Sequence, residues 1–266
     1  MKARRIDKVT LYNENAAETL DIREIAEYLE GKLKEAEVEA KGNPFTFYPE
    51  TSQDYAGKLA SIRIQDVSRE ITFEHEPLYG EVRYEKERIS GKTKGFGVVY
   101  DGFQLARVLM QLIPGEERKT GFVHILFTNR LFATWDDVNK RYHLRTSVYA
   151  IPSVISTTGI VEAPAKPREY YLLKQQYDRL GKDLTELKSS FEGRFIDYED
   201  NRLTEVAKGY VMQAVFYSLT GEPFCEDKGC RLYNAHWQEE LISAQLESKY
   251  EFCQRHARIL SEEYKS

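Results

Sequence analysis

The first fifty residues alternate between the two hydrophobic periods expected of an α/β fold. Lys8–Tyr12 alternates polar and apolar residues, which is typical of a strand. Asp21 then caps a predicted helix that runs to about Lys34, in which apolar residues recur at three- and four-residue steps. A second short strand is predicted within Val38–Tyr48. This order predicts a βαβ unit, in which a helix packs on a sheet.

The middle of the chain has mainly the patterns of strands. A helix is predicted over Asp101–Ile113, where Pro114 and Gly115 end the helical spacing. The charged, Gly-rich segment Glu85–Gly97 is predicted to be a loop. Further strands are predicted at Leu59–Val67, Ile71–Tyr84, Phe122–Asn129, Tyr142–Tyr149 and Ser153–Val161.

The pattern becomes helical from Glu169 onward. Arg202–Leu219 has apolar residues at three- and four-residue steps, and Gly221 is placed to end this helix. Two more helices are predicted over Asn234–Glu247 and Phe252–Tyr264. The predicted fold is therefore an α/β fold with a mixed sheet packed with helices and a C-terminal helical module. We expect one domain over residues 1–266, sheet-rich over 1–168 and helical over 169–266.

Composition and charge narrow the classes of partner. With 41% hydrophobic and 30% charged residues in 266, the chain has the composition of a globular protein. Its net charge of −5 does not favour nucleic acid as a partner, because phosphate binding depends on clustered Lys and Arg. No segment reaches the ~20 apolar residues of a membrane span. The N-terminus has no apolar signal region, so a cytoplasmic protein is expected.

The strongest chemical signal is a set of four metal-binding residue types near the C-terminus. All three cysteines lie between residues 225 and 253, as Cys225-x4-Cys230 and then Cys253-x2-His256. Zinc takes four nitrogen or sulfur ligands in a tetrahedron, and short-range pairs let one local turn present each half. An odd number of cysteines does not suit a disulfide framework. The spacing predicts one structural zinc ion.

This site requires a break in the last helices. A continuous helix from residue 236 to 262 would put Cys253 ~25 Å from its start, too far for the loop that carries Cys225 and Cys230. We therefore expect the helix to break at Glu247–Glu251. If it does not, His236 is the alternative fourth ligand, because it follows Cys230 by six residues.

The stretch Gly221–His256 resembles the C-terminal zinc module of the archaemetzincins, a family of metzincin-type zinc metalloproteases. The signature of that family is HExxHxxGxxHC, then four residues, a Cys and a Met-turn, with a C-x2-C near the end. Placing Cys225 on the Cys of the signature puts Gly221 and Cys230 at their expected positions, and Cys253-x2-His256 replaces the C-x2-C. The resemblance implies a zincin-like fold with a structural zinc in the tail.

The departures from this signature determine the expected function. The predicted helix from Arg202 corresponds to the active-site helix of the family. A catalytic zinc needs three protein ligands and a carboxylate to take a proton from the bound water. The positions of the first His, the Glu, the second His, the third His and the Met-turn are occupied by Ala214, Val215, Ser218, Phe224 and Leu232. The sequence thus predicts a scaffold or binding module for a protein or small molecule, without proteolytic activity.

A competing hypothesis places a site where predicted strands end. Arg141, His143, Glu162 and Lys166 form the most polar cluster there, and the ends of strands commonly host ligand sites. The segment Ser156–Gly159 can offer hydroxyl groups to an anion. The alternative function is therefore a non-metallo enzyme or an anion-binding protein.

Overall fold

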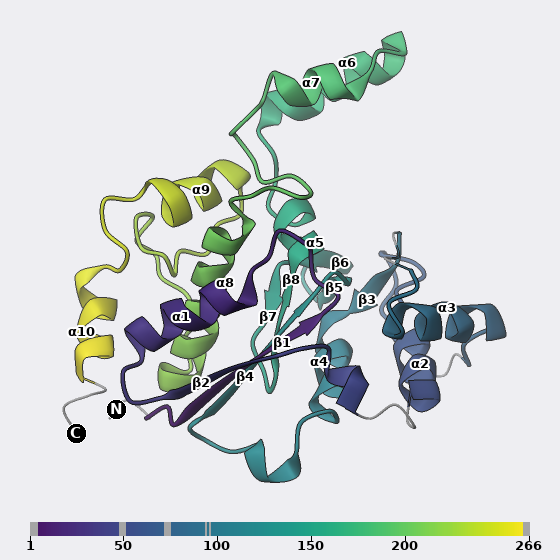
Figure 1. Ribbon diagram of the computed structural model, residues 1–266. Coiled ribbons are helices and arrows are strands. Elements are labelled where there is room, and N and C mark those ends of the chain that lie inside the picture. The colour runs from purple at the N-terminus through teal and green to yellow at the C-terminus, as the bar shows by residue number, and fades with distance from the viewer. Residues whose placement is uncertain (1–4, 48–51, 72–75, 94, 96, 263–266) are drawn as a thin grey trace.

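The computed structural model describes residues 5–47, 52–71, 76–93, 95 and 97–262. Its centre is a five-stranded sheet of order β2-β1-β4-β8-β7 (Figure 1). The first four strands are parallel, and the short β7 runs antiparallel to β8 at one edge. The strands are β1 (Lys8–Glu14), β2 (Glu37–Lys41), β4 (Phe122–Thr128), β7 (Ser147–Val148) and β8 (Ser153–Ser156).

Helices bury both faces of this sheet. Successive residues of a strand point to opposite faces, so in β1 Val9 and Leu11 belong to one hydrophobic core and Tyr12 to the other. The first core packs under α1 (Ile22–Lys32) and α8 (Leu203–Thr220). The second contains residues of α2 (Ser52–Ser61) and α4 (Gly102–Met110). The predicted β1-α1-β2 unit is confirmed, with Asp21 accepting hydrogen bonds from the first helical N–H groups.

A second, three-stranded sheet has the order β3-β5-β6. It consists of β3 (Val99–Asp101), β5 (Leu131–Asp136) and β6 (Arg141–Arg145), with β3 parallel and β6 antiparallel to β5. Short 3-10 helices occupy Pro44–Phe47 and Gly115–Glu117. The predicted class, a mixed α/β fold with helices packed on a sheet, is confirmed. The strands of the described residues lie between Lys8 and Ser156.

Three predicted strand segments are wrong, and each has a local cause. Leu59 belongs to α2, where Tyr55, Ala56 and Leu59 are buried at helical spacing. The described part of the segment Ile71–Tyr84 contains no strand, because residues from Tyr79 form α3 (Tyr79–Ile89). This helix also includes the first residues of the segment that was predicted to be a loop. Residues 72–75 of this segment lie outside the described residues.

The third error is at the end of β8. Ser156 caps a new helix, α5 (Thr157–Glu162), by accepting a hydrogen bond from the Gly159 N–H at 2.8 Å. A Cβ added at Gly159 would lie 2.5 Å from the Arg145 carbonyl oxygen. The glycine therefore allows α5 to approach the chain between β6 and β7, and β-branched residues alone do not reveal this turn.

A buried ionic cluster lies between the two sheets. Arg130 is fully buried and donates to Glu14 at 3.0 Å and to Tyr100 at 3.0 Å. It also forms an ion pair with Glu85 of α3, which is itself fully buried and paired with Arg63. Because buried charges are costly unless paired, this cluster ties α3 to the ends of β1 and β4.

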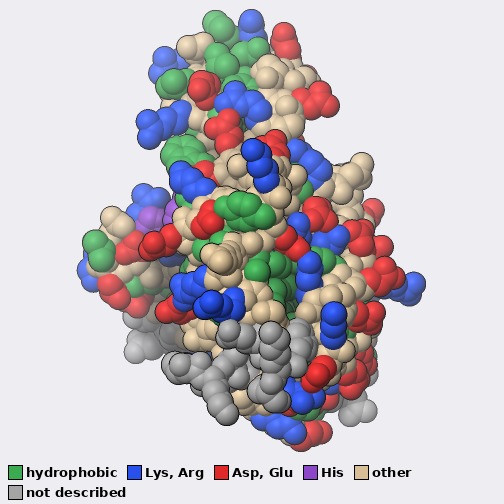
Figure 2. Space-filling view, turned by 90° about the vertical axis from the view of Figure 1, so that its left-hand side faces the viewer, with side chains coloured by type: hydrophobic (Ala, Val, Ile, Leu, Met, Phe, Trp, Pro, Cys, Tyr) green, Lys and Arg blue, Asp and Glu red, His purple; other side chains and the backbone are tan. Residues whose placement is uncertain are grey.

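The C-terminal part is helical, as predicted. α6 (Arg168–Leu180) and α7 (Leu184–Ser189) form an arm that projects from the body (Figure 1) and is the narrow top of the surface in Figure 2. On the face in Figure 2, basic and acidic side chains are interspersed. After α8 come α9 (Gln238–Ile242), the π-helical turn η4 (Ser243–Glu247) and α10 (Gln254–Glu262). In the described part of the chain, no helix has the length and apolarity required to cross a bilayer.

Candidate metal centre

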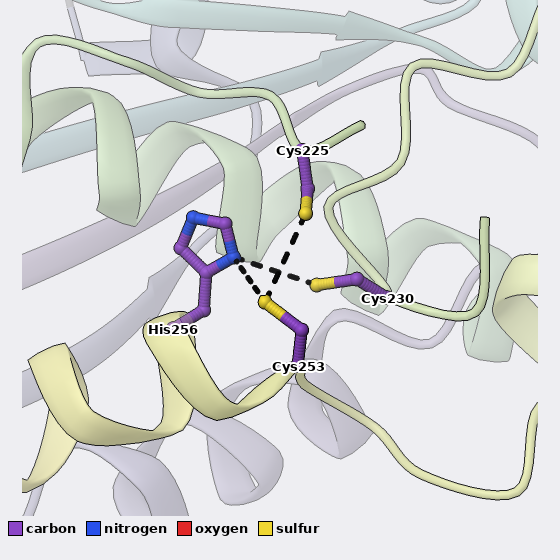
Figure 3. Close-up of side chains that lie close together, drawn as sticks. All are labelled: Cys225, Cys230, Cys253 and His256. Atoms are coloured by element: carbon purple, nitrogen blue, oxygen red, sulfur yellow. Dashed lines mark hydrogen bonds between the residues drawn. The ribbon is translucent and has the colours of Figure 1, made fainter. Parts of the chain in front are cut away.

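Four side chains from two distant segments converge between α8 and α10. The sulfur atoms of Cys225, Cys230 and Cys253 and a ring nitrogen of His256 all lie within 4.8 Å of one another. The Cys225 and Cys253 sulfur atoms are 3.9 Å apart, and the Cys230 sulfur lies 3.6 Å from the His256 Nδ1 (Figure 3). In a tetrahedral zinc site the sulfur–sulfur and sulfur–nitrogen edges are about 3.8 and 3.6 Å. The Cys253 sulfur lies closer to the His256 Nδ1, at 3.1 Å, so the four donors have the chemistry and approximately the size of a zinc site.

A tight turn presents the first pair of cysteines. Gly221 ends α8 with a φ of 82°, and the Cys225 N–H then donates to the Leu232 carbonyl at 2.9 Å. Within the turn, the Cys230 N–H donates to the Asp227 carbonyl at 3.0 Å. A Cβ on Gly229 would lie 2.5 Å from the Tyr250 hydroxyl, so the glycine lets this side chain lie close against the turn.

The predicted break in the last helices is confirmed. The helical run from Gln238 ends at Glu247, and α10 begins at Gln254. Between them the Ser248 hydroxyl donates to the Gly229 carbonyl at 2.6 Å, and the Glu251 carbonyl accepts from the Arg231 N–H at 2.8 Å. These bonds attach the connecting segment to the cysteine turn. As a result Cys253 and His256 face Cys225 and Cys230 (Figure 3).

The surroundings of Cys225, Cys230 and His256 disfavour the charged forms of these side chains in the absence of a cation. Burial raises the pKa of the Cys230 thiol to about 12 and also raises the pKa of Cys225. Burial lowers the pKa of His256, whose ring makes an edge contact with Phe216 at a centroid distance of 5.0 Å. A dication compensates clustered thiolates, so metal binding releases protons at this site.

His236, the alternative ligand, is not part of the cluster. Its side chain is exposed, and its backbone carbonyl accepts from the Ala165 N–H at 2.8 Å on another part of the molecule. The residue lines a cleft with Tyr149 and Phe224. The structure thus brings together the four residues of the first hypothesis.

The positions that correspond to a catalytic zinc site have no metal-binding groups. Ala214 and Val215 are buried in α8, and Phe224 packs edge-on against Tyr149 at a centroid distance of 5.8 Å. Ala214 and Ser218 line a cavity of about 380 Å³. Within the described residues, the group of donors at the tail is the only cluster of His, Cys, Asp or Glu with the geometry of a metal site.

His124 also lines that cavity, but its two ring nitrogens have protein partners. The Tyr12 hydroxyl lies 3.3 Å from Nδ1, and the Glu117 carbonyl lies 3.1 Å from Nε2. Burial lowers the pKa of His124, so the neutral ring is favoured.

The residues of the competing hypothesis have separate partners. His143 on β6 lies 3.3 Å from Asp136, and Glu162 accepts from the Tyr198 hydroxyl at 2.9 Å. The Lys166 ammonium lies over the rings of Tyr170 and Phe195. Arg141 is an exposed residue of β6, opposite Asp136. These contacts do not join the four residues into one site.

Comparisons with known proteins place the chain in a family. No curated protein matches it. Among solved structures, the crystal structure of archaemetzincin from Methanopyrus kandleri is similar over 98% of this chain and 97% of that chain, with 12% identity and a TM-score of 0.46. The family model described as a probable metallopeptidase family (DUF6775) matches residues 5–263. The chain therefore belongs to this probable metallopeptidase family.

Proposed function

We propose that this protein is a non-proteolytic, metzincin-like binding module with one structural zinc ion. One observation carries the proposal. At the places where the archaemetzincin signature has two histidines and a glutamate on the active-site helix, α8 has Ala214, Val215 and Ser218. The third histidine is replaced by Phe224.

The chemistry of these side chains does not fit a catalytic metal. A catalytic zinc requires three protein ligands, an open position for water and a base to accept the water proton. Methyl, isopropyl and phenyl groups cannot ligate zinc, and one hydroxyl group does not complete a site. The His124 ring is already bonded on both nitrogens. We therefore derive no hydrolytic step at α8.

The zinc at the tail is proposed to be structural because its four donors fill a tetrahedron. Cys225 and Cys230 directly follow α8, whereas Cys253 and His256 flank the start of α10. One ion would hold these two segments together and leave no position for substrate or water. In structural sites of this kind the free energy of metal binding stabilises the fold.

The binding surface is proposed to be the cleft beside the edge strand β7. This cleft has a volume of about 440 Å³, and Tyr149, Tyr217 and Phe224 give it aromatic walls. The rings of Tyr149 and Tyr217 lie 6.1 Å apart. Tyr149 donates to Gln213, whose amide donates to the Tyr233 carbonyl at 3.2 Å. Rigid aromatic groups beside an edge strand suit a polypeptide partner.

The metal hypothesis is tested by elemental analysis of protein purified without added metal. We expect about one zinc per chain. Cys230→Ser should lose the metal and destabilise the tail, whereas His236→Ala, at an exposed histidine outside the cluster, should retain it. A folded wild-type protein without metal would contradict the hypothesis, and so would loss of zinc in His236→Ala.

The absence of proteolysis is tested with peptide libraries in the presence of added zinc. We expect no cleavage above that of a buffer control. In parallel, immobilised peptides should reveal binding that Tyr149→Ala weakens, with Tyr79→Ala, at an exposed residue of α3 outside the cleft, as a matched control. Chelator-sensitive cleavage that persists through stringent purification would refute the non-proteolytic assignment.

A further inference from the structure

The three thiols of the metal centre differ in their access to solvent. Cys230 is fully buried in the first hydrophobic core, and its sulfur lies 3.6 Å from the His256 Nδ1. Cys225 and Cys253 are half-buried and pack against that core from outside. The reaction of a thiol with a dissolved oxidant depends on its exposure. In the folded protein, Cys225 and Cys253 are therefore the two cysteines that an oxidant can reach.

The two accessible thiols also face each other. The Cys225 and Cys253 sulfur atoms are 3.9 Å apart, although the residues are 28 positions apart in the sequence (Figure 3). A disulfide has a sulfur–sulfur distance of about 2.05 Å, so the two atoms must approach by about 1.9 Å. Cys225 lies after α8, and Cys253 lies directly before α10. The movement can therefore be made by residues that belong to no helix.

Burial, rather than distance, distinguishes this pair from the other pairs of thiols. All four donor atoms of the cluster lie within 4.8 Å of one another. A disulfide with Cys230 would have to form inside the core, because that side chain is 0% exposed. Cys225 and Cys253 meet at the surface of the core, where the oxidant arrives.

We propose that the tail is an oxidation-sensitive switch, in which a disulfide between Cys225 and Cys253 replaces zinc as the link between the two segments. With hydrogen peroxide as the oxidant, one thiol attacks the peroxide, becomes a sulfenic acid and releases one water molecule. The second thiol attacks the sulfenic sulfur, forms the S–S bond and releases a second water molecule. The two thiols lose two electrons and two protons, and the peroxide takes these up as it becomes water. From zinc-bound thiolates, the two protons come from the solvent.

Oxidation of this pair is incompatible with metal binding. Cys230 and His256 are the two donors that remain, and a structural zinc site needs four. The inference rests on the proposed function in this respect, because the reduced tail is taken to hold zinc. The cross-link itself needs only the two accessible thiols. We therefore expect the oxidised protein to contain the disulfide and no zinc at the tail.

The cross-link would join the same two segments that the metal joins. Between Cys225 and Cys253 lie α9 and η4, and the disulfide closes this part of the chain into a loop. A closed loop has less conformational freedom in the unfolded state, which stabilises the folded state. The tail would thus remain attached after the metal has been lost. Reduction by a dithiol, which is itself oxidised to a cyclic disulfide, would restore all four donors.

The experiment treats the full chain, as purified, with hydrogen peroxide and maps its cysteines by mass spectrometry after alkylation. We expect one main cross-link, between Cys225 and Cys253, with Cys230 recovered as a thiol that is alkylated after unfolding. Zinc release, measured with a chromogenic chelator, should rise with the cross-linked fraction to about one ion per disulfide. A main cross-link that includes Cys230, or oxidation to sulfinic and sulfonic acids without a cross-link, would overturn the proposal.

The same measurements separate this switch from the proposed function. Protein that contains zinc but does not form the cross-link would overturn the switch alone. Protein that is folded and free of zinc before oxidation would instead contradict the structural metal site.

Thermal unfolding of the wild type tests whether the disulfide replaces the metal as a link. One sample is treated with chelator, and another with chelator and then peroxide. The second should melt roughly 5 °C above the first, because the cross-link again connects the two segments. Equal melting temperatures of the two samples would overturn the proposal.

Two matched serine variants separate the cross-link from the metal. Cys230→Ser removes one zinc donor but leaves both accessible thiols, so peroxide should still form the disulfide and raise the melting temperature. Cys225→Ser also removes one zinc donor but leaves no pair of accessible thiols, so peroxide should not raise its melting temperature. Equal responses of the two folded variants would overturn the proposal, and the chelated wild type decides it if a variant does not fold.

Discussion

Replacement of Arg130 by methionine removes the cation at the centre of the buried ionic cluster. The guanidinium lies between two carboxylates, with Glu14 1% exposed and Glu85 fully buried. In Arg130→Met, Glu85 keeps its contacts with Arg63 and Tyr100, whereas Glu14 keeps the hydrogen bond from the Thr128 hydroxyl but loses its cation. The variant therefore leaves negative charge buried without its main compensation.

The expected loss follows from the burial of these groups. Removal of one partner from a buried ion pair costs about 3–5 kcal/mol. That is a large share of the ~5–15 kcal/mol that stabilises a typical domain. The triple variant Glu14→Gln, Glu85→Gln, Arg130→Met should lose less than the single variant, because it leaves no unpaired charge.

The assay is unfolding in urea, monitored by fluorescence. The free energies of unfolding are compared between variants that share the same slope of free energy against urea concentration. Measurements at two pH values test the role of the buried carboxylate directly. Without Arg130, the buried Glu85 favours its protonated form, so the deficit of the single variant should be smaller near pH 5 than near pH 7.5. A loss below about 1 kcal/mol in Arg130→Met, or a triple variant less stable than the single one, would refute the reasoning.

Three further outcomes are expected. Burial alone would raise the pKa of Glu85, but Arg130 and hydrogen bonds hold the pKa of the folded protein below the usual 4.5. The ionised Glu85 therefore stabilises the fold above pH 4.5, and this contribution is lost as the pH falls through the lower pKa of the folded state. The free energy of unfolding should fall in that acid range in the wild type and fall less in Glu85→Gln. Gly159→Ala should destabilise by about 1–3 kcal/mol through contact with Arg145, whereas Gly31→Ala, with open space around its Cβ, should be neutral or stabilising in thermal melts. Chelation should lower the melting temperature and expose residues 248–262 to limited proteolysis first, and an unchanged digest would contradict the structural role of zinc.

The features that depend on local spacing could be predicted from the sequence. The helix before Gly221 follows from apolar residues at helical steps, and the structure places it at Leu203–Thr220. The cluster of four metal-binding side chains follows from two pairs that are close in sequence, because each local turn positions its own two donors. The break in the helix near Ser248 followed from geometry. Four donors can surround one ion only if the two segments that carry them come close together.

The features that depend on distant partners could not be predicted. α3 buries Glu85 and Arg88, and charged residues on the inner face hide the hydrophobic pattern of a helix. The charge of Glu85 is compensated by Arg130, which is more than forty residues away along the chain, and Arg88 donates to Tyr100 and Asn129. Likewise, the hydroxyls of Thr157 and Thr158 were expected to donate to an anion. The structure shows that they donate to backbone carbonyls instead, and only the folded arrangement of three strand ends reveals this.

The order in which the chain is made has a consequence for the metal centre. Cys225 and Cys230 leave the ribosome before the two donors beside α10 and after the residues of α8 and of the sheet, so the two thiols await their partners. Domains begin to fold from the N-terminal side during synthesis. A zinc ion can gain its full set of ligands only after His256 has emerged. Metal capture would then be a late event in biogenesis, and zinc-starved cells would accumulate chains with a formed sheet and a loose tail, a natural target for quality-control proteases.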